Sequence, residues 1–131
     1  MSLRESLLGA WTLESFVARD VESGDDRHPL GSAPRGLITY TADGHMSAQL
    51  AESDMQGYIA YGGGFSVDEE TATVHHEVTI SMLPELLAQP QFRHASVDGD
   101  LLTLSATTTD AAGVQTDARL SWRRARPTLG R

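Results

Sequence analysis

The sequence predicts an all-β protein: an eight-stranded antiparallel up-and-down barrel with short helical segments. Two observations favour this fold class. Short runs of alternating or β-branched residues fill most of the chain, and turns rich in Gly and Asp-Gly separate them. Closing such a sheet into a barrel pairs the edge strands that an open sheet would leave exposed. A two-sheet sandwich is the alternative architecture.

Composition narrows the class of protein. The chain has 131 residues, no cysteine and a formal net charge of −8. We expect one barrel domain over residues 1–131, with a core at about 7–124 and a flexible tail at 125–131. Nucleic acids and anionic membranes require clustered positive charge, so neither is an expected partner. No signal peptide and no membrane span are recognised, so we expect a cytoplasmic protein without disulfides.

The first half of the chain contains four predicted strands, at residues 11–18, 36–41, 45–51 and 65–67. Alternate residues from Trp11 to Val17 are expected to share one face of the first strand. A polar loop over 20–34 follows it. Asp43-Gly44 predicts a tight hairpin. Helical spacing within 52–60 indicates a short helix, which the glycine run 62–64 follows.

The second half contains four more predicted strands, at residues 73–80, 91–97, 101–107 and 114–124. Asp98-Gly99 predicts a hairpin between the second and third of these. Residues 81–90 carry leucines at helical spacing between two prolines, which indicates a short amphipathic cap over an open end of the barrel.

Two adjacent histidines stand out in the strand predicted at 73–80. Strand neighbours point to opposite faces, so His76 shares the apolar face and His75 the polar face. The residues expected on the apolar face with His76 are Val74, Val78 and Ile80. An interior imidazole can hydrogen-bond a ligand carbonyl or move a proton. The alternative is a core histidine held neutral by a hydroxyl or a backbone group.

Arg93 is the second candidate. Its face of the strand also carries Ala95 and Val97, whereas the opposite face carries Phe92. If Arg93 points inward, it is a buried cation that a ligand carboxylate or enolate would neutralise. The alternative is a rim arginine whose head reaches solvent.

Tyrosines supply both apolar wall and hydrogen-bond donors to a pocket. The catalytic candidates are His76, Arg93 and Tyr40. The expected ligand-binding set is His76, Arg93, Tyr40, Tyr58, Tyr61, Phe65, Met46 and Val78. No cofactor is expected, because dinucleotide and phosphate-loop motifs are absent. No metal is expected either, because adjacent strand histidines cannot chelate one ion and a His76–His94 pair lacks a third ligand.

Several segments carry a family resemblance. Leu8-Gly9-Ala10-Trp11-Thr12-Leu13 resembles the Gly-x-Trp signature of lipocalins. The other matching segments are residues 36–40, 43–50, 58–61, 65–70, 74–76, Arg93 and 99–104. In this order they resemble the bacterial lipocalin-like domain family across roughly Leu7 to Arg124.

The resemblance implies a calycin-type β-barrel with a ligand cavity. It also implies that Arg123 or Arg124 stacks across Trp11 and closes one barrel end. Gly63-Gly64-Phe65 departs from a bulkier segment in relatives, and we expect it to enlarge or loosen one wall.

Three functions follow from the resemblance and the candidate residues. The first is a barrel that holds a small apolar or amphipathic molecule, in bacterial natural-product metabolism. The second is a cyclase or isomerase that acts on a polyketide-like substrate in the same cavity. The third is a non-catalytic structural domain with a filled barrel. A homodimer is compatible with all three.

Overall fold

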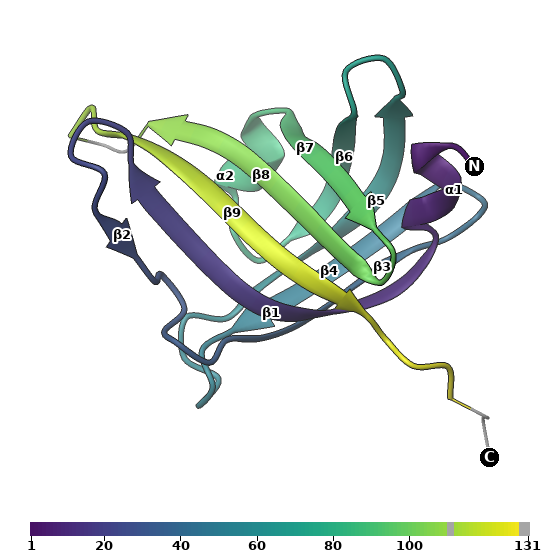
Figure 1. Cartoon of the computed structure of the whole chain (residues 1–131), viewed down its shortest axis with the longest axis horizontal. Coiled ribbons are helices and arrows are strands. Elements are labelled where there is room, and N and C mark those ends of the chain that lie inside the picture. Colours follow the sequence, from purple (N-terminus) through teal and green to yellow (C-terminus); the bar gives the residue numbers. More distant parts are fainter. Residues whose placement is uncertain (110–111, 129–131) are drawn as a thin grey trace.

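The strands of the computed structural model form a closed antiparallel barrel (Figure 1), and the structure describes residues 1–109 and 112–128. Neighbouring strands of the sheet follow the order β2-β1-β3-β4-β5-β6-β7-β8-β9, and an additional β1–β9 pairing closes the sheet. The strands are β1 (Gly9–Asp20), β2 (Asp26–Arg27), β3 (Arg35–Tyr40), β4 (His45–Ala51), β5 (Ile59–Asp68), β6 (Thr73–Ser81), β7 (Gln91–Asp98), β8 (Leu101–Thr109) and β9 (Gln115–Arg124). The predicted eight-stranded up-and-down barrel is confirmed, and β2 is a two-residue addition to β1 within the predicted polar loop.

The helix predicted within residues 52–60 is wrong. This segment turns instead: the Glu52 N–H donates to the Gln56 carbonyl over 2.9 Å, and Met55 has a φ of 68°. Strand β5 then begins at Ile59 and includes the glycine run. Residues 59–64 pair with β4 along its whole length, whereas a helix of two turns has little stability of its own.

A register shift in β1 changes which residues face the interior. Trp11 and Leu13 are buried as predicted. The pairing with β9 shifts between Leu13 and Ser15, and beyond it Phe16 packs against the core and Ala18 is buried. The prediction that the alternation continues to Val17 is therefore wrong, because a bulge exchanges the two faces of a strand.

A second register shift separates the two halves of β6. Gly62 pairs with Ile80 but Gly63 pairs with Val78, so β6 has one extra residue there. Val74 and His76 stay inside, whereas Ile80 is 72% exposed, which contradicts its predicted interior position. A Cβ on Gly63 would lie 2.1 Å from the Glu77 carbonyl oxygen, so the glycine run brings β5 and β6 together instead of loosening the wall.

Helix α1 (Leu3–Leu7) covers one end of the barrel, where the β5–β6 turn also lies (Figure 1). Ser2 and Glu5 form a capping box, and the backbone N–H groups of Leu3 and Arg4 donate to the Glu69 carboxylate over 2.8 and 3.1 Å. The Leu7 side chain is fully buried beneath this helix. Residues just before the first predicted strand thus close this end.

Helix α2 (Glu85–Ala88) connects the far end of β6 to β7 and packs against β6. It lies at the opposite end of β6 from α1 (Figure 1), and the predicted amphipathic cap over 81–90 contains it. The predicted tail at 125–131 falls partly outside the described residues, and its described part, 125–128, forms no strand.

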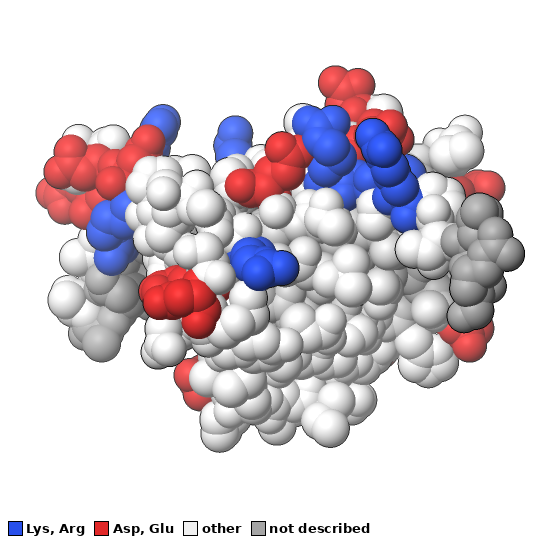
Figure 2. All heavy atoms as spheres, turned by 90° about the horizontal axis from the view of Figure 1, so that it is seen from below, with Lys and Arg blue, Asp and Glu red and all other residues white. Residues whose placement is uncertain are grey.

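The charged side chains are unevenly distributed over the surface. Figure 2 shows a broad uncharged area in the middle of one face, with arginines and acidic side chains mixed along its border. No helix among the described residues has the length and apolar character to cross a membrane.

Candidate functional site

Three strands bring a histidine and two tyrosines together inside the barrel. The Tyr40 hydroxyl, from β3, lies 2.6 Å from His76 Nε2, and the Tyr61 hydroxyl, from β5, lies 3.3 Å from His76 Nδ1. His76 and Tyr40 are almost fully buried, with exposures of 1% and 2%. We call these three side chains the Tyr–His–Tyr cluster. Both ring nitrogens of His76 therefore have a hydroxyl partner.

Apolar side chains surround the cluster. The Phe65 ring meets the Tyr40 ring edge-on at 4.9 Å between centroids, and Phe65 is the cross-strand neighbour of His76. Met46 is paired with Tyr40 on the neighbouring strand and is also buried. The low polarity of these surroundings strengthens the hydrogen bonds within the cluster and disfavours charge there.

The cluster is held in its neutral form. Burial, together with the charges of Arg93 and His75, lowers the pKa of His76 to about 3. Burial also raises the pKa of both Tyr40 and Tyr61, which Arg93 opposes. At neutral pH the cluster therefore consists of one neutral imidazole and two intact hydroxyls.

Neutrality has a consequence for hydrogen bonding. A neutral imidazole has one N–H and one lone pair, so one tyrosine donates to the ring and the other accepts from it. The accepting tyrosine keeps its own O–H for a third partner. No described residue accepts a hydrogen bond from either hydroxyl apart from His76. The cluster thus offers one unused donor in either tautomer.

A second buried donor is also unused. Trp122 is 1% exposed, and its Nε1 has no hydrogen-bond partner among the described residues. By contrast, the indole of the equally buried Trp11 donates to the Leu7 carbonyl over 2.9 Å. The unmet hydrogen-bonding capacity of these interior side chains is therefore of donor type.

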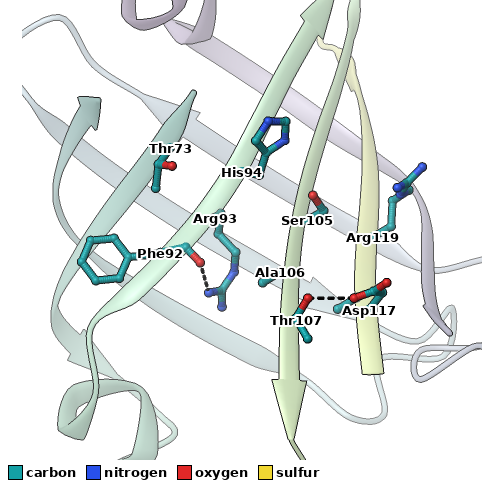
Figure 3. Close-up of a pocket in the computed structure, with 10 residues that line it drawn as sticks. Thr73, Phe92, Arg93, His94, Ser105, Ala106, Thr107, Asp117 and Arg119 are labelled. Atoms are coloured by element: carbon teal, nitrogen blue, oxygen red, sulfur yellow. Dashed lines mark hydrogen bonds between the residues drawn. The ribbon is translucent and has the colours of Figure 1, made fainter. Parts of the chain in front are cut away.

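Arg93 lies on the inward-facing side of β7, as the alternation with Ala95 predicts. Figure 3 shows its guanidinium in the gap where β7 and β8 separate. The two strands pair only from His94 and Ser105 onward, which leaves the residues before His94 unpaired on this side. Arg93 is partly buried and lies beside an outer groove of about 430 Å³.

A second groove runs beside the strand that carries His76. It has a volume of about 290 Å³ and lies between β6 and α2. The pairing of β6 with β7 ends at His76 and Gln91, so the rest of β6 has α2 beside it instead of a strand. His76 and Val78 line this groove together with Leu86, so the groove borders the part of β6 that carries the imidazole.

The structure thus gathers most of the predicted site residues. Tyr40, Met46, Phe65 and His76 lie in the interior, Tyr61 joins them through its hydroxyl, Val78 lines the α2 groove, and Arg93 fills the β7–β8 gap. Tyr58 is not among them: it is 42% exposed and lines an outer groove beside Leu37 and Met55. Tyr58 was expected at the pocket because it flanks the glycine run, but its ring lies on the outer surface.

Two interior residues were not among the predicted site residues. Gln91 is buried and contacts Arg93, and Trp122 carries the unused indole donor. Gln91 stands two residues before Arg93, so the strand alternation that placed Arg93 inward could have identified it. The described residues contain no group of three or more His, Cys, Asp or Glu side chains that could hold a metal ion.

The sequence model of the lipocalin-like domain family matches residues 8–56 and 51–125, which together span most of the chain. The chain belongs to the lipocalin-like domain family. No curated protein matches it significantly. The arginine expected to stack on the first-strand tryptophan of this lipocalin-like barrel is Arg124, whose Cζ lies 4.1 Å from the centre of the Trp11 ring.

Proposed function

We propose that this lipocalin-like barrel binds a small apolar or amphipathic molecule, with a hydrogen-bond acceptor of that molecule directed at the Tyr–His–Tyr cluster. The observation that carries the proposal is the unused hydroxyl donor of a buried, neutral cluster. Binding sites for small molecules are mostly apolar and contain a few placed polar groups, which is the composition found around His76.

A filled structural core explains the cluster less well. Three polar side chains inside a barrel cost free energy unless every donor and acceptor is paired. Here one tyrosine O–H and the Trp122 N–H have no partner among the described residues. A ligand carbonyl would accept from such a donor, and the α2 groove runs beside the part of β6 that carries His76.

The proposal can be tested with a neutral naphthyl ketone dye, propionyl-dimethylaminonaphthalene. Its emission shifts to the blue in apolar surroundings and to the red when its carbonyl accepts a hydrogen bond. We expect saturable binding with a blue-shifted emission, and quenching of the buried tryptophans on titration. Absence of saturable binding would contradict the proposal and favour a filled barrel.

A matched pair of variants locates the dye. Tyr61→Phe removes a hydroxyl of the cluster, whereas Tyr58→Phe removes a hydroxyl from an exposed ring on the outer surface. We expect Tyr61→Phe to weaken binding by about fivefold to tenfold, the worth of one hydrogen bond, and Tyr58→Phe to leave it unchanged. Equal effects of the two variants would place the dye outside the barrel.

A second candidate is a cyclase or isomerase of natural-product metabolism acting on a polyketide-like substrate. It is favoured by the same cluster, because an imidazole that accepts at one nitrogen and donates at the other can pass a proton between two hydroxyls without becoming charged. Enolisation of a ketone moves one proton from the α-carbon to the carbonyl oxygen, and the proposed role of the cluster is to take up the first proton and supply the second. The test is exchange of the α-hydrogens of the ketone dye in D₂O, followed by NMR, with His76→Gln as the inactive control.

A further inference from the structure

We infer that the ligand of this barrel is an acid, an apolar body bearing a carboxylate or another anionic oxygen, and that Arg93 binds the anionic oxygen from within the gap between β7 and β8. The inference rests on the proposed function and names the class of molecule that the same interior accepts. Three features of the described residues support it.

The first feature is that Arg93 has no carboxylate partner among residues 1–109 and 112–128. Its Nη1 donates to the Phe92 carbonyl over 2.8 Å and its Nη2 donates to Gln91 Oε1 over 3.1 Å, and both acceptors are neutral. No ion pair among the described residues includes Arg93. A guanidinium has five N–H donors, so most of its hydrogen-bonding capacity is left for a ligand. A partly buried cation of this kind is stabilised by an anion.

The second feature is that Gln91 holds the guanidinium in place. The Gln91 Nε2 donates to the carbonyl of Gln89 over 2.8 Å and to that of Leu86 over 3.4 Å, which ties the side chain to the α2 segment. Its Oε1 is thereby directed at Arg93. An arginine positioned by a buried amide is preorganised for the planar, two-pronged contact that carboxylates make.

The third feature is the position of Arg93 relative to the cluster. The guanidinium charge acts on all three members, since it lowers the pKa of Tyr40, Tyr61 and His76. The unused hydroxyl donor of the cluster adds to the donors of Arg93. Hydrogen-bond donors, one of them charged, complement an anionic oxygen, which only accepts.

The chain as a whole would repel such a ligand. Its formal net charge is −8, so an acid that nevertheless binds must gain its affinity from a local cation. Arg93 supplies that cation at the gap (Figure 3). Arg119 lines the same outer groove from β9 and provides a matched control of equal charge.

The experiment compares two dyes with the same ring system: propionyl-dimethylaminonaphthalene, which is neutral, and the corresponding dimethylaminonaphthoate, which is anionic at pH 7. We expect the wild-type chain to bind the naphthoate about tenfold more tightly than the ketone, the worth of one charge-assisted contact. Arg93→Gln should abolish this preference by weakening naphthoate binding about tenfold. Arg119→Gln should retain the preference.

Each other outcome overturns the inference. Equal affinity of the wild-type chain for both dyes, or a preference that survives Arg93→Gln, removes Arg93 as the anion site. Loss of the preference in Arg119→Gln places the anion in the outer groove instead. Binding of the ketone without preference leaves the proposed function intact, whereas binding of neither dye overturns both. If Arg93→Gln does not fold, Arg93→Lys keeps the charge and loses the two-pronged contact, and it should reduce the preference.

Discussion

The hydroxyl of Tyr40 lies 2.6 Å from Nε2 of His76, and both side chains are inaccessible to solvent. The two residues are 36 positions apart in the chain and come from strands β3 and β6, which are not neighbours in the sheet. The contact therefore crosses the barrel interior instead of running along its wall. Folding therefore buries His76 as a neutral imidazole that is hydrogen-bonded to Tyr40.

This neutral state predicts that acid destabilises the fold. The folded pKa of His76, about 3, lies below its ordinary value of 6.5, so the unfolded chain binds a proton more readily. The contribution of neutral His76 to the free energy of unfolding is therefore complete above pH 6.5 and is lost as the pH falls toward 3. Between pH 7 and pH 5 the free energy of unfolding should decrease by about 2 kcal/mol because of His76 alone. Urea denaturation at the two pH values measures the change.

His76→Gln is the control for this prediction. Glutamine keeps one donor and one acceptor but cannot take up a proton in this range. We expect the variant to have a lower free energy of unfolding than the wild-type chain at pH 7. Between pH 7 and pH 5, however, its free energy of unfolding should fall by about 2 kcal/mol less than that of the wild-type chain. The same pH dependence in both proteins would show that His76 is not the titrating group.

The two tryptophans should respond differently to the same substitution. Both are almost fully buried, but the Trp11 indole donates to the Leu7 carbonyl whereas the Trp122 indole has no partner in the described part of the chain. Both Trp→Phe changes remove a similar side-chain volume. The difference between their losses of unfolding free energy therefore reports the hydrogen bond and the Arg124 contact of Trp11. Trp11→Phe should cost about 1–3 kcal/mol more unfolding free energy than Trp122→Phe. Equal losses in urea denaturation would contradict this assignment.

Adjacent arginines at the end of β9 should also differ. Arg124 stacks on Trp11 and donates to the carbonyls of Leu8 and Ser6 over 3.0 and 2.9 Å, which fastens α1 to the barrel end. Arg123 pairs with Glu14 on the exposed surface. Arg124→Met should lower the free energy of unfolding by about 2 kcal/mol, and Arg123→Met by less than about 1 kcal/mol. Thermal denaturation of the two variants ranks them, and the reverse order would refute the closing role of Arg124.

The β5–β6 bulge predicts unequal tolerance of two neighbouring glycines. A Cβ on Gly63 would lie 2.1 Å from the Glu77 carbonyl oxygen and 2.8 Å from the Thr79 nitrogen, both backbone atoms. A Cβ on Gly64 would meet the end of the flexible Glu77 side chain at 3.3 Å. Gly63→Ala should cost more than about 3 kcal/mol, whereas Gly64→Ala should cost less than about 1 kcal/mol. Chemical denaturation tests both, and tolerance of Gly63→Ala would mean that the strands can separate there.

Much of the fold could be predicted from local patterns. The hairpins at Asp43-Gly44 and Asp98-Gly99 and most strand positions follow from turn chemistry and alternation, because these signals act over a few residues. Alternation also placed His76 inward, and the structure agrees, whereas it left the orientation of Arg93 open between the two faces of its strand. The segment at 52–60 resisted prediction, since its helical spacing competed with pairing of 59–64 against β4.

The sequence by itself determined the fold class, the interior position of His76 and the family, because period-two patterning and turn residues are properties of short segments. Only the tertiary structure decided that Tyr40 and Tyr61 take the two nitrogens of one imidazole, that Ile80 leaves the interior, and that Arg93 fills a gap in the wall. Those outcomes depend on bulges and on where strand pairing stops. Both are set by closing the whole sheet into a barrel, which no single segment encodes.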